Sequence, residues 1–253
     1  MPRFVPLPLL LSSALLLYGC GLASARRSQD WHDVTDARLL RCCHVDNHGS
    51  GVLLAQDHRD LWILTNAELV SRVARVHVVD PATRRWTETT AWVAASGDGR
   101  VSELALLRAE PLPFLPPFAT QLASPVADGS SREIDLLPVS VSDVPRAYRL
   151  PAVGRRSAGT AVDATMPAVE RERLCVHGGL RQANSGTPIF DGDRLVGLTA
   201  PGALDAVLED TGDDGAAMRR KVTGIAASTP QEIDAFLRTN GHGALADRLA
   251  AAH

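Results

Sequence analysis

Three short stretches hold the side chains most able to do chemistry. They are "QANSGTP" (182–188) with Ser185, "ILTNAELV" (63–70) with Glu68, and "SELALL" (102–107) with Glu103. A serine hydroxyl acts as a nucleophile when a neighbouring base accepts its proton and later returns that proton to the leaving group. Imidazole does both near neutral pH, whereas a carboxylate is a weaker base and carries almost no proton there. A serine served by carboxylates would therefore be a poor nucleophile at pH 7.

The elements that must position these residues are predicted to be short β-strands, because apolar runs alternate with Gly, Asp and Asn turns. The segment 109–125 is dense in proline, which has no N–H to donate to a sheet, and it is expected to be an extended linker. Six strands on each side of this linker indicate an all-β fold of two packed barrels in one domain. The strands are expected at 38–45, 49–56, 61–65, 72–80, 89–96 and 103–109, then at 133–141, 147–154, 159–164, 172–178, the hairpin 187–200 and 221–227.

Two local signals are especially clear. The hairpin within 187–200 has an Asp-Gly pair at 191–192, which is typical of a tight turn. One helix is predicted at 229–240, where Thr229 and Glu232 form a capping box and Gly241 ends the helix. Residues 241–253 are expected to be a tail.

Taken in order, "GSGVLLAQ", "ILTNAELV", "SELALLRA", "PFLPPFAT", "QANSGTPIFDGDRLVGLTA" and "VTGIAASTPQEIDAFL" resemble the chymotrypsin-fold (trypsin-like) serine peptidases, and most of all the HtrA (Deg) type. The resemblance covers about residues 38–238. It implies a trypsin-like double β-barrel with the active site in the cleft between the barrels. The implied domain is 34–238, with barrel one at 36–108, the linker at 109–125, barrel two at 126–228 and the helix at 229–240.

The resemblance assigns roles only where this chain matches the family's motifs. Ser185 stands where the family has its nucleophile, and the backbone N–H groups of Ala183 and Ser185 would form the oxyanion hole. Glu68 stands in the place of the base, which is histidine in the family. Glu103 stands in the place of the orienting aspartate. The specificity pocket would be lined by Gly179, Leu180, Thr199 and Ala200, which suits a small or apolar side chain.

Two functions from different classes follow from this degenerate triad. The favoured hypothesis is a pseudopeptidase that binds peptide or protein in the cleft between the barrels, where the family has its active site. It is favoured because none of the eight histidines falls at a matching position. The alternative is an active serine endopeptidase that uses Ser185 with Glu68 as its base, in an acid-dependent manner. A third interpretation treats the barrels as scaffold only. Glu68 also has a simpler explanation, because a carboxylate suits the start of a helical turn. His44, His48 and His177 are expected to be surface or packing residues.

Residues 1–25 are predicted to be a secretory signal, with Arg3, an apolar run to Leu17 and a small-residue exit. "LYGC" (17–20) resembles a lipobox that would leave a lipidated Cys20, and "ASA" (23–25) suits ordinary cleavage before Arg26. Both alternatives predict export, to the cell envelope or outside the cell, with the membrane involved only through a lipid at Cys20. The net charge of −3 gives no reason to expect nucleic-acid binding.

Export permits disulfides, and after Cys20 only Cys42, Cys43 and Cys175 remain. Cys175 could pair with either Cys42 or Cys43, and three small buried hydrophobic residues are an equal alternative. No cofactor and no metal are expected. The Cys-Cys pair lacks zinc-ligand partners, and the acidic stretch 208–215 lacks the spacing of an EF-hand.

Overall fold

The computed structural model describes residues 29–30, 38–46, 49–97, 102–125, 131–140, 146–147, 150–160, 170–177, 185–211 and 217–250. The predicted signal segment 1–25, with its lipidation candidate Cys20, lies outside these residues. Within them, no helix combines the length and the apolar character that crossing a membrane requires.

Barrel one is built from antiparallel strands in the order β2-β5-β6-β7-β4-β3, and β2 pairs again with β3, so the sheet returns on itself. A short strand from the proline-rich linker, β8, is added to the outer side of β3. The bounds are β2 Cys42–Val45, β3 Gly49–Gln56, β4 Leu61–Asn66, β5 Val73–Asp80, β6 Arg85–Ser96, β7 Leu104–Ala109 and β8 Phe118–Ala119.

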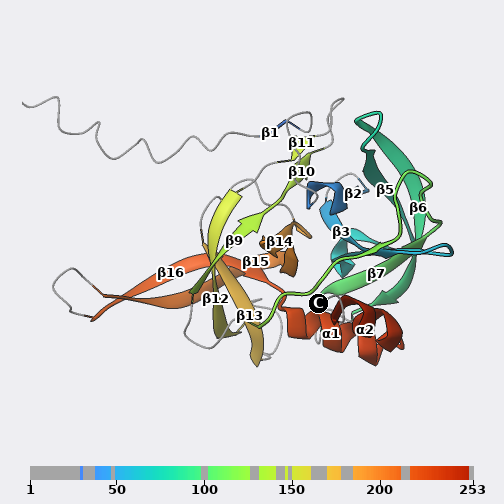
Figure 1. Cartoon of the computed structure of the whole chain (residues 1–253). Helices are drawn as coiled ribbons and strands as arrows, with labels where there is room; N and C mark the ends of the chain where they lie inside the picture. The colour runs from blue at the N-terminus through green and yellow to red at the C-terminus, as the bar shows by residue number, and fades with distance from the viewer. Residues whose placement is uncertain are drawn as a thin grey trace, which may run out of the picture.

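Barrel two is a closed barrel in the order β12-β13-β16-β15-β14-β9. The bounds are β9 Ser131–Leu136, β12 Leu150–Thr160, β13 Glu170–His177, β14 Pro188–Asp191, β15 Arg194–Thr211 and β16 Ala217–Ala227. A small separate sheet contains β1 Gln29–Asp30, β10 Val139–Ser140 and β11 Arg146–Ala147. Figure 1 shows the two barrels next to one another, as the all-β double-barrel prediction requires.

Strand β3 shows why the apolar runs are continuous rather than alternating. All eight of its residues are buried. Leu53 faces the interior of barrel one, whereas Val52 and Leu54 face a second core that also contains Phe190 and Leu198 of barrel two. A strand that is buried on both faces is expected to be apolar at successive positions.

The structure differs from the predicted strands in several places. Residues 133–141, expected to be one strand, form β9 and the separate β10. Strand β12 runs without a break through the expected gap between the predicted strands 147–154 and 159–164. Residues 38–41 were expected to be strand but form a turn and the 3-10 helix η2 (Leu39–Arg41). The buried Arg38 side chain explains this, because it forms an ion pair with Asp135 of β9 at 3.0 Å and so ties the chain to barrel two before β2 begins. The hairpin turn lies at Gly192-Asp193, one residue later than predicted, and Gly192 adopts the positive φ of 57° that the turn requires.

Two helices follow barrel two and lie together beside barrel one (Figure 1). Helix α1 (Pro230–Thr239) begins as predicted, because the Thr229 side chain accepts a hydrogen bond from the Glu232 N–H at 3.2 Å. Helix α2 (Gly243–Ala250) replaces most of the expected tail. It forms because Leu245 and Leu249, four residues apart, are buried in the core that joins the two barrels.

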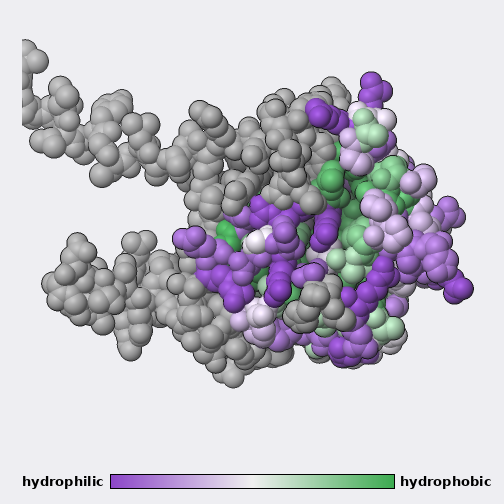
Figure 2. All heavy atoms as spheres, in the orientation of Figure 1, coloured by the Kyte–Doolittle hydropathy of each residue, from purple (hydrophilic) through white to green (hydrophobic). Residues whose placement is uncertain are grey.

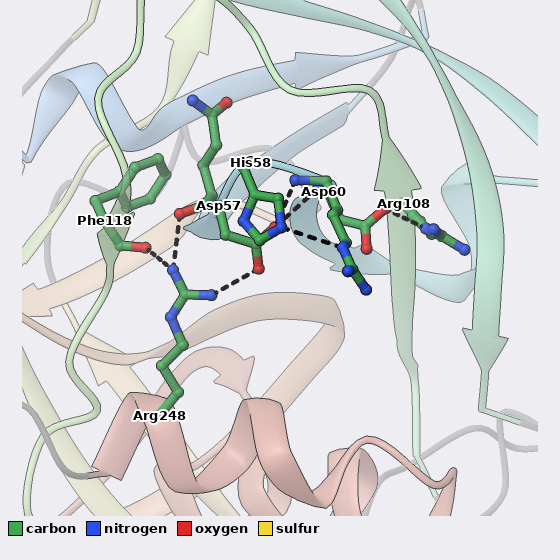
Figure 3. Close-up of polar contacts among 8 residues, drawn as sticks. Asp57, His58, Asp60, Arg108, Phe118 and Arg248 are labelled. Atoms are coloured by element: carbon green, nitrogen blue, oxygen red, sulfur yellow. Dashed lines mark hydrogen bonds and ion pairs between the residues drawn. The ribbon is translucent and has the colours of Figure 1, made fainter.

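Arg248 of α2 fastens this helix to barrel one. Its guanidinium donates to the Asp57 carboxylate at 3.1 Å and to the carbonyl oxygens of Gln56 and Phe118 at 2.7 and 2.9 Å (Figure 3). The pKa of Asp57 is lowered, first by the hydrogen bond from the Arg59 N–H and then in part by Arg248. One cation therefore joins the end of β3, the strand β8 and the C-terminal helix.

Replacing Arg248 by methionine, which keeps the apolar stem, is expected to lower the free energy of unfolding by about 1–2 kcal/mol, because three charge-assisted hydrogen bonds at a half-buried position are lost. Urea unfolding followed by circular dichroism measures this change. The control is Arg238→Met, which removes two exposed ion pairs, with Asp234 and Asp247, and should still have a smaller effect. Equal losses in the two variants would contradict the role given to Arg248.

The disulfide predicted between Cys175 and Cys42 or Cys43 does not form. All three residues are described, and their side chains are buried thiols. The reason is geometric. Cys42 and Cys43 point to opposite faces of β2 in barrel one and enter two different cores, whereas Cys175 lies on β13 of barrel two among Ala200 and Ala226. The alternative of small buried hydrophobic residues is the one that the structure supports.

His77 is expected to make the stability of the protein depend on pH. Burial lowers the pKa of His77, Arg75 lowers it further, and Glu88 and Asp46 oppose the shift. The unfolded chain, with a histidine pKa of about 6.5, therefore binds the proton more readily than the folded chain does. Stability should fall as the pH drops through about 6.5, and His77→Gln should reduce this fall. Thermal unfolding between about pH 5 and pH 8 tests it, and identical pH profiles for both proteins would be the contrary result.

Candidate functional site

The turn that carries Ser185 is held by both barrels. Gly186 adopts a φ of +78°, and its N–H donates to the Thr199 carbonyl oxygen at 2.9 Å. The Ser185 carbonyl oxygen accepts from the Ser50 N–H of β3 at 3.0 Å. The Thr187 N–H donates to the Thr199 hydroxyl at 3.0 Å. Ser185 is therefore fixed at the junction between β3 of barrel one and the β14–β15 region of barrel two.

Glu68 reaches Ser185 from the other side of this junction. Strand β4 ends at Asn66, and the 3-10 helix η3 (Ala67–Leu69) follows with Glu68 exposed in its first turn. The Ser185 hydroxyl donates to Glu68 Oε1 at 2.5 Å. The two residues are 117 positions apart in the chain. The structure thus brings together the serine and the glutamate that the sequence singled out.

Asn66 is a third member of this cluster, which the sequence motifs did not indicate. Its side chain is buried, and Nδ2 donates both of its hydrogens, one to Ser185 Oγ at 2.6 Å and one to the Thr199 carbonyl oxygen at 2.7 Å. Since a carbonyl oxygen can only accept, Thr199 fixes which end of the amide faces Ser185. Asn66 precedes η3 where an asparagine commonly caps a helix, yet its side chain makes no capping bond.

Glu103 lies beside the turn that carries Glu68. Asn66 pairs with Leu104 in the β4–β7 register, and the Ala67 N–H donates to the Glu103 carbonyl oxygen at 2.7 Å. Ser102, just before Glu103, is 3.4 Å from the Glu232 carboxylate of α1. The segment around Glu103 therefore supports η3 through its backbone and connects it to the capping box of α1.

The environment of the Ser185 hydroxyl differs from that of a serine with an imidazole base. Its proton is bonded to a carboxylate, and its oxygen accepts from an amide that has no acid–base function. Three of the described histidines lie away from Ser185. His44 stacks near His77 between β2 and β5, with ring centroids 6.1 Å apart, and His242 packs edge-on against Trp62. His44 is thus a packing residue, as predicted.

The other predicted site residues divide into two groups. Ala183 of the oxyanion hole and Gly179 and Leu180 of the specificity pocket lie outside the described residues, as do His48 and the side chain of His177. Thr199 and Ala200 are described and buried, and Thr199 is bonded to the Ser185 turn. In the part of the chain that the structure covers, no three His, Cys, Asp or Glu side chains are grouped so as to hold a metal ion.

The sequence matches no protein-family model and no curated protein. The structure is similar to several solved serine proteases. The active form of the Rv3671c protease from M. tuberculosis has a TM-score of 0.54 and 21% identity over 81% of this chain and 82% of that chain. The MamO protease domain from Magnetospirillum magneticum has a TM-score of 0.51 and 17% identity over 79% of this chain and 97% of that chain. Kallikrein-related peptidase 10 has a TM-score of 0.52 and 15% identity over 81% of this chain and 98% of that chain. The chain therefore has the trypsin-like serine protease fold.

Proposed function

We propose that this protein is an exported pseudopeptidase, which binds peptide or protein ligands at the junction of its two barrels without hydrolysing them efficiently. The fold supports a peptide ligand, because proteins of this fold act on polypeptides. The predicted signal segment 1–25 supports export, to the cell envelope or beyond it.

The observation that carries the proposal is the pair of hydrogen bonds at Ser185 Oγ. The carboxylate of Glu68 accepts the hydroxyl proton at 2.5 Å, but a carboxylate is a weak base and has almost no proton to return to a leaving amine at neutral pH. Asn66 donates a hydrogen bond to the hydroxyl oxygen and so occupies one of its two lone pairs. The hydroxyl is held firmly by groups that cannot complete a proton-transfer cycle.

A peptide-binding measurement tests the binding half of the proposal. Fluorescent peptides from an unstructured protein such as casein should bind the full chain with saturable anisotropy. Glu68→Trp should abolish this binding, because an indole at the exposed 68 position would occupy the space in front of Ser185. Glu110→Trp, at an exposed position just after β7, is the matched control and should bind like the original protein. No saturable binding, or equal loss in both variants, would favour the scaffold interpretation.

The alternative function is an active serine endopeptidase that uses Glu68 as its base. The 2.5 Å contact between Ser185 and Glu68 favours it, because a serine and its base must be in hydrogen-bond contact. Such an enzyme would cleave the same peptides, and Ser185→Ala would abolish the cleavage. The proposed pseudopeptidase would bind the peptides and leave them intact.

A further inference from the structure

A second region with functional potential lies away from Ser185. A cavity of about 630 Å³ opens between the β14–β15 hairpin, the segment around η2 and the strand β8. Its lining includes Arg38, Arg41, Gln121, Asp193 and Arg194, and none of its lining residues belongs to the Ser185 cluster. Figure 2 shows hydrophilic side chains gathered over the middle of the visible face, where β14 and β15 lie in Figure 1. The volume is in the range of cavities that bind small molecules.

One of the three arginines in this cavity serves the structure. Arg38 Nη1 donates to the Asp135 carboxylate and to the Gly192 carbonyl oxygen, both at 3.0 Å, and the Arg38 side chain is 10% exposed. Asp191, which also lines the cavity, lies 3.3 Å from Arg132. These charges are matched within the protein and fix the walls of the cavity.

The other two arginines, Arg41 and Arg194, have no such match. Among the described residues, no carboxylate lies within ion-pair distance of either guanidinium. Arg41 is held over the Phe118 ring, with its central carbon 5.7 Å from the ring centroid. Burial lowers the pKa of Arg41, and the charge of Asp193 only partly opposes this. The cavity therefore contains a half-buried cation, already oriented by an aromatic ring, and a second cation from the facing hairpin.

We propose that this cavity binds a small oxyanion ligand, whose phosphate or carboxylate groups are held by the guanidinium groups of Arg41 and Arg194. Guanidinium offers planar paired donors that fit both groups, and an anion would supply the charge that the partly desolvated Arg41 lacks. Asp193 lowers the affinity of the cavity for anions, because its carboxylate competes for Arg41 and repels a negatively charged ligand. The proposal is independent of the chemistry at Ser185.

Because the two arginines come from different barrels, a bound ligand would affect the stability of the fold. Arg41 precedes β2 of barrel one, and Arg194 begins β15 of barrel two. The Gln121 carbonyl oxygen accepts from the Leu195 N–H at 2.7 Å, so the linker and the hairpin are already joined at the edge of the cavity. An anion bound by both arginines would bridge the two barrels and stabilise the folded protein by mass action.

Titration calorimetry and thermal unfolding of the full chain test the proposal, with inorganic phosphate, pyrophosphate or citrate added at constant ionic strength. We expect saturable heat and a rise in Tm with at least one anion. Pyrophosphate binding without citrate binding would assign the site to phosphate groups, and the reverse would assign it to carboxylates. The proposal would be overturned if none of these anions, at about 100-fold molar excess over protein at micromolar concentration, produced binding heat or a rise in Tm.

Four variants locate the binding. Arg41→Gln and Arg194→Gln should each weaken it at least about fivefold, the loss of one charge-assisted contact, and Asp193→Asn should strengthen it. Arg85→Gln, at an exposed position on β6, is the matched control and should bind normally. Arg194→Gln and Asp193→Asn keep the test decisive if Arg41→Gln fails to fold. Equal affinities in Arg194→Gln, Asp193→Asn and Arg85→Gln would overturn the proposal.

Discussion

Replacing Gly186 by alanine is expected to lower the free energy of unfolding by about 3 kcal/mol or more. Gly186 has a φ of +78°, and a Cβ at this position would overlap the Ser50 carbonyl oxygen, which belongs to backbone and cannot move aside easily. The same displacement would break the contact between the Ser185 turn and β3. Chemical denaturation measures the loss, and the bound peptide should be lost with it.

Gly192→Ala is the matched control for this prediction. Gly192 also has a positive φ, of 57°, but no heavy atom outside Gly192 and its two chain neighbours lies within 4 Å of the place where its Cβ would be. Its replacement should lower stability by only about 1–2 kcal/mol, the effect of the backbone conformation alone. A Gly186→Ala variant no less stable than Gly192→Ala would contradict the close approach of the Ser185 turn to β3.

Replacing Glu68 by histidine is expected to raise the rate of peptide hydrolysis at neutral pH by about 10² or more. The side chain at position 68 already reaches Ser185 Oγ, so an imidazole there would accept the hydroxyl proton and return it to the leaving amine. Glu103, just before β7, lies next to the same turn, because its backbone carbonyl oxygen accepts a hydrogen bond from the Ala67 N–H. Release of dye from a quenched peptide measures the rate.

Two further variants show whether any gain comes from the intended site. Glu68→His combined with Ser185→Ala should have no more activity than the original protein, and Glu68→Gln, which has no basic group, should also gain none. If Glu68→His binds the peptide with unchanged affinity and hydrolyses it no faster, the absence of a histidine base does not explain the low reactivity of Ser185.

The sequence predicted the architecture well because burial leaves a direct pattern. Strands such as β3, buried on both faces, are apolar at successive positions, and the capping box of α1 is a local signal between Thr229 and Glu232. Helix α2 was missed although Leu245 and Leu249 were visible, because eight residues are too few for periodicity to stand out. The disulfide prediction was wrong because cysteine counts carry no information on which barrel core each thiol enters.

The candidate site was predictable only in part. The motif around Ser185 and the corner at Glu68 indicated two segments that the structure brings into contact at 2.5 Å. Asn66 was missed, because its two hydrogen bonds, to Ser185 and to Thr199, depend on the approach of segments more than 110 residues apart. The charges in the arginine-lined cavity were equally hidden, since Arg41 and Arg194 lie at the ends of elements from different barrels.

Reaction of the protein with a fluorophosphonate probe, from about pH 4 to about pH 8, distinguishes a pseudopeptidase from a working serine peptidase, because the probe reports the nucleophilicity of the serine hydroxyl without needing the right substrate. The pseudopeptidase account predicts no labelling of Ser185 above that of Ser185→Ala at any pH, while Glu68→His is labelled near neutral pH. Labelling of the original protein that disappears in Ser185→Ala would contradict the account and establish the carboxylate-assisted peptidase instead.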